Sequence, residues 1–164
     1  KDRTDYEEQV YEGFAPHGVA IMVETATDNG TRTVANVRMH FNKSGGALGT
    51  SGSVGFMFTR VGEFKCKKAD GINIEDLELE LIDYGLEEIG EDAEGNIIIR
   101  TAFNDFGAMS KVLEEKGIEV TTAETNRIPQ NTVELSEEQA QEVLKLVDNL
   151  EQDDDVQKVY HNLK

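Results

Sequence analysis

Side chains that commonly do chemistry are scarce in this sequence. The one cysteine, Cys66, lies between Lys65 and Lys67, and the three histidines are His17, His40 and His161. Metal ligands recur at short spacings and a cysteine nucleophile needs a neighbouring base, and the sequence has neither pattern. Acidic residues are so numerous that chance supplies carboxylate pairs. We therefore predict a protein that is not an enzyme and has no metal site or cofactor, with Cys66 on the surface of a strand.

A glycine-rich segment is the nearest approach to a ligand-binding motif. It reads Ser44-Gly45-Gly46-Ala47-Leu48-Gly49-Thr50-Ser51-Gly52-Ser53. Closely spaced glycines let backbone N–H groups approach an anion such as phosphate. A phosphate loop, however, follows a strand and opens a helix, whereas this segment follows a predicted helix and lacks the Gly-Lys-Ser/Thr ending. We favour a tight helix-to-strand connection, and as an exposed loop it can also contact a partner.

Charge is distributed unevenly along the chain. The formal net charge is −17, from 33 acidic and 16 basic residues, and the stretch from Asn73 to Glu94 holds ten acidic residues and no Lys or Arg. Such a surface repels phosphate backbones. Seven basic residues concentrate the positive charge in the first half: Arg32, Arg38, Lys43, Arg60, Lys65, Lys67 and Lys68. They predict a confined basic strip that could contact nucleic acid, with a solvated helix face and strand edge as the alternative.

The elements that would position these residues follow from turn signals and hydrophobic spacing. A hairpin is predicted from strands 10–14 and 19–23, followed by a helix over 31–43 and strands over 54–59 and 63–67 that are linked by Arg60-Val61-Gly62. Further along, helices are expected over 73–84 and 105–116, a hairpin over 86–89 and 97–101, and a strand over 119–125. A helix with a capping box at Ser136 and a strand over 156–161 complete the pattern.

Element order predicts an α+β fold with two ferredoxin-like lobes, the first discontinuous and interrupted by the second. Residues 63–125 run strand, helix, strand, strand, helix, strand, which is the split βαβ order. We assign residues 1–70 and 130–164 to the discontinuous lobe and 71–129 to the inserted lobe, and strand 63–67 could belong to either. The segments outside the insertion can form a module of the same type.

The sequence also allows predictions about the cellular location of the protein and about whether the chain is complete. No apolar run approaches the roughly 20 residues of a membrane span, the first residues do not read as a signal peptide, and a single cysteine cannot form an internal disulfide. We expect a cytoplasmic protein with no membrane partner. Because the chain opens on Lys1 in place of Met, we also expect it to be a piece of a longer protein.

Several stretches together closely resemble the YebC/PmpR family. They are Tyr11 to Gly18 (Tyr-Glu-Gly-Phe-Ala-Pro-His-Gly), Thr27 to Arg38, Phe41 to Val54, Ile128 to Asn131 and Asp153 to Tyr160, so the resemblance spans nearly the whole chain. That family includes bacterial proteins described as transcriptional regulators and the mitochondrial translational activator of cytochrome c oxidase subunit I. The resemblance implies a basic helical N-terminal domain, missing here, followed by two α+β lobes of which the first is interrupted by the second.

The combined expectation is a regulator of gene expression whose partner is DNA, or the ribosome and its RNA, and whose binding requires the missing N-terminal domain. The residues expected at the interface are Arg32, Arg38, Lys43, Gly45, Gly46, Gly49 and Ser53. The alternative is a small-molecule sensor with a ligand cleft between the lobes. Oligomeric state does not follow from the sequence.

Overall fold

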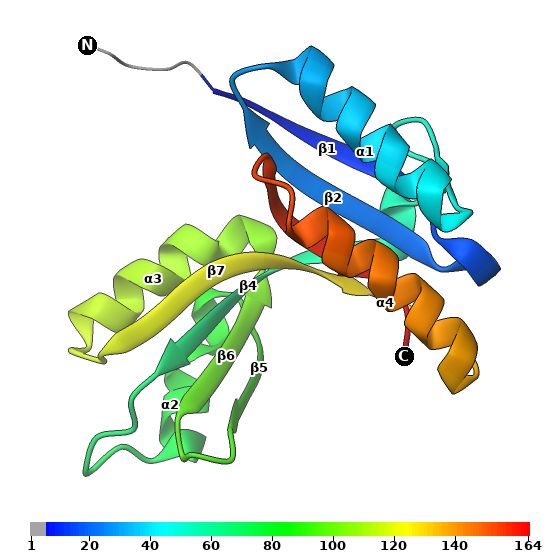
Figure 1. Cartoon of the computed structure of the whole chain (residues 1–164). Helices are drawn as coiled ribbons and strands as arrows, with labels where there is room; N and C mark the ends of the chain where they lie inside the picture. The colour runs from blue at the N-terminus through cyan, green and yellow to red at the C-terminus, as the bar shows by residue number, and fades with distance from the viewer. Residues whose placement is uncertain (1–5) are drawn as a thin grey trace. The chain divides into compact units, whose positions relative to one another are not determined.

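The computed structural model describes residues 6–164, and these form two compact units (Figure 1). One unit contains the residues up to Thr59 together with Pro129–Lys164, and the other contains Arg60–Ile128. Each unit has one four-stranded sheet and two helices, so the predicted α+β class with an interrupted first lobe is confirmed. The first five residues of the expected first lobe lie outside the described residues. None of the described helices is long and apolar enough to cross a membrane.

In the first unit the sheet has the strand order β3-β1-β2-β8. Its elements are β1 (Glu7–Phe14), β2 (Ala20–Thr27), α1 (Gly30–Ser44), β3 (Ala47–Leu48), α4 (Glu137–Glu151) and β8 (Val156–His161), with 3-10 turns at Pro16–Gly18 and Gly55–Met57. β1 and β2 form the expected hairpin, in which Phe14 pairs with Ala20. β8 pairs antiparallel with the other edge of β2. Segments from both ends of the chain therefore build one sheet.

Alternating side chains on β2 serve two different cores. Ile21 and Val23 face α1 and α4, and they pack with Phe41 of α1 and Leu150 of α4. The neighbouring residues, Ala20 and Met22, point to the opposite face of the sheet. There they pack with Val54 and Phe58, which follow the glycine-rich segment. That segment therefore carries the chain around the edge of the sheet, from the helical face to the opposite face.

In the second unit the sheet has the order β5-β6-β4-β7, and the predicted succession of six elements is confirmed. The elements are β4 (Phe58–Cys66), α2 (Ile74–Leu81), β5 (Leu86–Glu91), β6 (Ile97–Ala102), α3 (Phe106–Glu115) and β7 (Val120–Pro129), with 3-10 turns at Ile82–Tyr84 and Phe103–Asp105. Phe64, Ile97 and Ile99 on one sheet face pack against Leu81 of α2 and Leu113 of α3. β7 extends past the expected end at residue 125 to Pro129.

The chain differs from expectation between Val54 and Cys66. The turn predicted at 60–62 does not exist, because β4 is continuous from Phe58 and its residues Val61 and Gly62 pair with β6. A Cβ at Gly62 would lie 2.5 Å from the Phe106 ring, so close packing explains this glycine. The predicted strand over 54–59 is largely replaced by a 3-10 turn at Gly55–Met57.

The division between the units also lies earlier than the boundary assigned from the sequence. The boundary between the two compact units lies at Thr59/Arg60, whereas the sequence analysis placed it at 70/71. It lies earlier because strand residues Val61 to Cys66 pair with β6 of the second unit. On the return path the division lies at Ile128/Pro129, one residue before the assigned position. That each unit folds by itself stays a prediction.

Candidate nucleic-acid interface

Helix α1 carries all three basic residues of the expected interface. It begins where Asn29 Oδ1 accepts the N–H of Arg32 at 3.1 Å and ends at Gly45, whose φ is 88°. Its buried stripe is Thr33, Val37 and Phe41, and the residues on the opposite side, among them Ala35, Arg38 and Asn42, are exposed. The helix contains Arg32, Arg38 and Lys43 and no acidic residue. α1 is therefore a cationic element in a strongly anionic chain.

Arg38 and Lys43 lie together on the outer face of α1. Both are exposed, and with Ala35, Met39 and Asn42 they line one shallow depression. Within residues 6–164 neither side chain has a hydrogen-bond partner or an acidic group within 4 Å. We call these five residues the α1 patch. Its two cations remain available to a polyanion.

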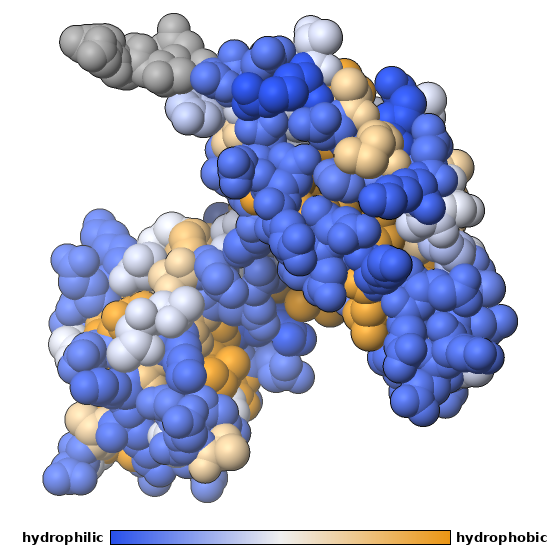
Figure 2. All heavy atoms as spheres, in the orientation of Figure 1, coloured by the Kyte–Doolittle hydropathy of each residue, from blue (hydrophilic) through white to orange (hydrophobic). Residues whose placement is uncertain are grey.

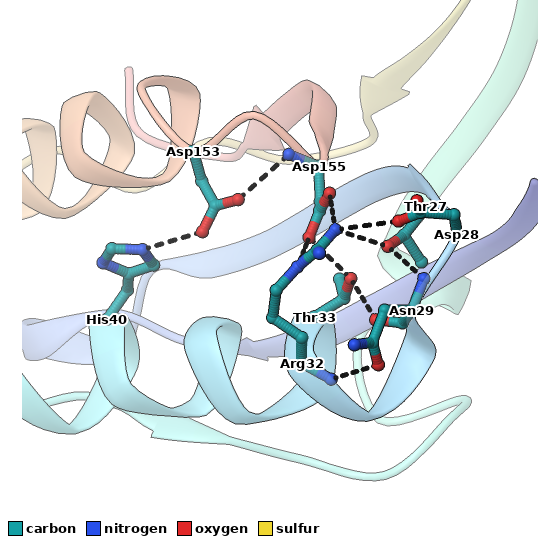
Figure 3. A network of polar contacts seen from close by, with 8 residues as sticks. All are labelled: Thr27, Asp28, Asn29, Arg32, Thr33, His40, Asp153 and Asp155. Carbon is teal, nitrogen blue, oxygen red and sulfur yellow. Dashed lines mark hydrogen bonds and ion pairs between the residues drawn. The ribbon is translucent and has the colours of Figure 1, made fainter.

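Arg32 has a different role from the other two. Its Nε and a terminal nitrogen donate to the two carboxylate oxygens of Asp155 at 3.1 and 2.8 Å, and that terminal nitrogen also contacts Thr27 and Asp28 (Figure 3). These hydrogen bonds raise the pKa of Arg32 and lower the pKa of Asp155. The expectation that Arg32 shares an open basic surface with Arg38 and Lys43 is not supported, because its guanidinium is bound within the protein.

The contact between Arg32 and Asp155 belongs to a network that joins α1 to the loop before β8 (Figure 3). Thr33 Oγ1 donates to Asp155 Oδ2 at 2.8 Å, and the Asp155 N–H donates to Asp153 Oδ1 at 3.0 Å. The other Asp153 oxygen lies 3.2 Å from His40 Nε2. Two carboxylates of the acidic run at 151–155 are therefore held by α1, and Arg32 compensates the charge of Asp155.

The other basic residues of the expected strip are engaged within the second unit. Lys68 lies 2.9 Å from Glu91, and Lys67 lies 3.8 Å from Glu119. Lys65 lies within 4 Å of both Asp92 and Glu94, and Arg60 sits 3.8 Å above the centre of the Phe103 ring. These pairs are partly exposed and individually weak. The three lysines are nevertheless compensated locally, and the Phe103 ring covers the Arg60 guanidinium, so among residues 6–164 Arg38 and Lys43 are the members of the predicted strip with neither kind of contact.

Packing explains the glycines of the expected interface. Gly45 and Gly46 end α1, with their N–H groups donating to the carbonyls of Asn42 and Phe41 at 3.2 and 3.0 Å. A Cβ at Gly46 would collide with the Phe14 carbonyl, and one at Gly49 would lie 2.8 Å from Ser53 Oγ. These contacts support the tight helix-to-strand connection. The structure brings Gly45 next to the α1 patch, but Ser53 lies where the chain reaches the other face of the sheet.

A carboxylate that the sequence analysis did not single out organises the rest of this loop. Glu12 is buried on β1, and its oxygens accept the N–H groups of Gly52, Val54 and Gly55 at 2.8, 3.0 and 2.6 Å. The converging N–H groups therefore bind an anion that belongs to the chain, which does not favour a phosphate at this position. In the sequence, the only indication of this role is that Glu12 is an acidic residue within a predicted, partly buried strand.

Beyond the Glu12 contacts, the chain presents an aromatic side chain to solvent. Phe56 is 69% exposed on the 3-10 turn Gly55–Met57. Gln130 fixes the backbone of this turn, since its N–H donates to the Met57 carbonyl at 2.9 Å and its side-chain amide donates to the Phe56 carbonyl at 3.1 Å. An exposed aromatic ring on a fixed backbone is suited to contact with a partner.

The surroundings of the cysteine do not favour a role as a nucleophile. Cys66 is fully buried on β4, which corrects the expected surface position, and burial raises the pKa of its thiol to about 11. The nearby lysines therefore do not activate it. Among the described residues, no group of three His, Cys, Asp or Glu side chains could hold a metal ion.

Comparison with known proteins identifies the family. The family model described as "TACO1/YebC second and third domain" matches residues 6–163. The chain belongs to the TACO1/YebC family. A relative from Myxococcus xanthus is 57% identical over 98% of this chain and 68% of its own length, and a relative from Flavobacterium johnsoniae is 52% identical over 100% of this chain and 68% of its own length. Both are named "Probable transcriptional regulatory protein".

A solved structure has the same fold. The crystal structure of a conserved hypothetical protein, Aq1575, from Aquifex aeolicus aligns with a TM-score of 0.80 at 38% sequence identity. The alignment covers 100% of this chain and 67% of the Aquifex protein. The two relatives and the Aquifex protein therefore extend beyond the part that corresponds to the present chain.

Proposed function

We propose that the chain belongs to a non-enzymatic regulator of gene expression that acts in the cytoplasm and contacts the phosphate backbone of DNA or ribosomal RNA through the α1 patch. The observation that carries the proposal is the pair of exposed cations, Arg38 and Lys43, which have no acidic partner among the described residues. The names of the relatives from Myxococcus and Flavobacterium support a regulatory role.

The negative net charge limits the affinity with which this chain alone can bind nucleic acid. With a net charge of −17, most of its surface repels a polyanion. Two cations neutralise about two phosphates, which accounts for weak binding with a salt slope of about −2. A tight complex therefore requires further basic groups in the full-length protein, and the α1 patch adds affinity and orientation.

The test removes the two patch charges from the full-length protein. In R38Q/K43Q, affinity for the true partner should fall by about tenfold, and the slope of log affinity against log salt should shrink by about 2. The matched control is K111Q/K145Q, which removes two exposed cations from α3 and α4. Co-sedimentation with ribosomes and a DNA mobility-shift assay at matched salt should each be performed on both variants.

The two assays separate the two partners. Loss of ribosome co-sedimentation with unchanged DNA binding identifies the ribosome, and the reverse identifies DNA. Equal losses in R38Q/K43Q and in the control would show that net charge acts without a defined surface and would contradict the proposal. The expected ligand cleft between the lobes stays a prediction.

A further inference from the structure

Helix α2 has a second apolar stripe that the fold does not use. Leu77 and Leu81 are buried in the core of the second unit. On the opposite side, Leu79 of α2 and Ile82, the first residue of the 3-10 turn that continues the helix, lie three positions apart and are 70% and 53% exposed. Figure 2 shows hydrophobic residues reaching the surface of this unit among hydrophilic ones. Adjacent exposed aliphatic side chains on one helix face favour contact with another apolar surface.

Carboxylates flank this stripe on both sides. At 100° per residue, Glu78 projects on the far side of Ile82, and Glu75 projects between Leu79 and Ile82 one turn earlier. Asp83, in the 3-10 turn Ile82–Tyr84, projects on the far side of Leu79. We call these five residues the α2 face. Within residues 6–164 none of the three acids has a basic group within 4 Å, whereas Glu80 nearby is paired with Lys116. The α2 face therefore combines an apolar centre with uncompensated negative charge.

This combination selects the chemistry of the occupant. DNA, RNA and anionic lipid would bring negative charge against the three carboxylates. A second copy of the chain would place two identical acidic faces together, which is also repulsive. A partner helix with apolar residues at i, i+3 and i+4, flanked by Lys or Arg, would match both the apolar centre and the negative charge of the α2 face. We propose that the α2 face docks a basic amphipathic helix of a protein partner, an interaction that is independent of the nucleic-acid contact proposed for α1.

A defined probe can test the docking. We would titrate a helical peptide of about 18 residues, composed of Leu and Lys with one apolar stripe, into the ¹⁵N-labelled protein. Amide shifts should concentrate on α2 and the 3-10 turn that follows it, and Leu79→Glu should weaken binding by about tenfold or more. Because Leu79→Glu adds negative charge, a purely electrostatic attraction would instead strengthen binding. The matched control is Leu144→Glu on α4, which alters a leucine that is 43% exposed and should leave the affinity unchanged.

Charge reversal provides a second variant that keeps the apolar pair. E75K/D83K should weaken the Leu/Lys peptide and strengthen a Leu/Glu peptide of the same pattern. The proposal is overturned if Leu79→Glu binds the Leu/Lys peptide as tightly as the parent protein, or if the shifts fall outside residues 74–84. It is also overturned if the α2 shifts depend on protein concentration without peptide, since that result would identify a second copy as the occupant.

Discussion

At the scale of single residues, Asp155 makes several contacts with the N-terminal end of α1. It is 7% exposed, it accepts from Arg32 and Thr33, and its backbone carbonyl accepts the N–H of Ala26 at 2.9 Å. The carboxylate therefore joins α1 to β8 in the folded state. Arg32 and Arg38 lie on the same helix, and the position of this one carboxylate gives them different roles.

The first prediction concerns Asp155→Asn. Loss of the charged hydrogen bonds should lower the free energy of unfolding by about 1 to 2 kcal/mol at pH 7, where the half-exposed Arg32 side chain reduces the effect through solvent screening. The pKa of Asp155 is lowered in the folded state. Its stabilising effect is therefore full above the unfolded pKa of about 3.9 and is lost as the pH falls through the folded pKa.

Urea denaturation at several pH values measures this effect. The difference between Asp155→Asn and the parent should be largest near neutral pH and should shrink below about pH 3.9. Asp154→Asn, in the same run but without a side-chain contact to Arg32, serves as the control. A difference that stays constant down to the lowest pH would contradict the assigned ion pair.

Sequence reasoning identifies residue types better than it identifies partners. The exposed cations Arg38 and Lys43 follow from helical spacing, because the apolar stripe of α1 is local. The binding of Arg32 to Asp155 does not follow, since the two residues are 123 positions apart and meet only in the folded unit. The burial of Cys66 does not follow from the sequence either. Lysines on both sides of a strand residue do not show whether that residue points into the core.

At the scale of elements, the helix ends were predictable and the path of the glycine-rich segment was not. Asn73 and Ser136 cap α2 and α4 as expected, with N–H to side-chain oxygen distances of 3.0 and 3.2 Å. Such caps depend on residues three positions apart. The turn at Gly55–Met57 depends on Glu12, about forty positions earlier, and the absence of a turn at Gly62 depends on close packing with Phe106.

The second prediction concerns Glu12→Gln. The amide can supply one accepting oxygen, but its NH₂ group would face a backbone donor among Gly52, Val54 and Gly55. We expect a loss of about 1 to 3 kcal/mol in the free energy of unfolding and faster exchange of these backbone amides. Hydrogen exchange by NMR measures both, with Glu8→Gln, an exposed change on the same strand, as the control. Unchanged exchange at these amides would contradict the role of Glu12.

At the scale of the whole molecule, the chain leaves the first unit and returns to it through neighbouring strands. β4 and β7 are adjacent in the second sheet. On the side of the first unit, the N–H of Gln130 donates to the carbonyl of Met57 at 2.9 Å, so the outgoing and returning segments are already side by side. A short connection can therefore replace the inserted unit without stretching the first one.

The third prediction is that both units fold after they are separated. Replacing Arg60–Ile128 with a short Gly/Ser linker should leave a protein with native-like helix content and dispersed amide signals. The excised Arg60–Ile128 should give the same result, because its core lies within that range. Circular dichroism and NMR spectra measure this. A collapsed spectrum for either piece would show that the units depend on each other for stability.

The discontinuous core also determines the order in which the nascent chain can fold. Ile21, Val23 and Phe41 are synthesised before the inserted unit, whereas Val143 and Leu150, which pack with them, are synthesised after it. The inserted unit has all its strands once Pro129 has been added, so it can fold first. Until α4 arrives, α1 covers only part of the helical face of the first hairpin, and the rest remains open to water and to chaperones. Loss of α4 and β8 would leave that part of the face permanently uncovered.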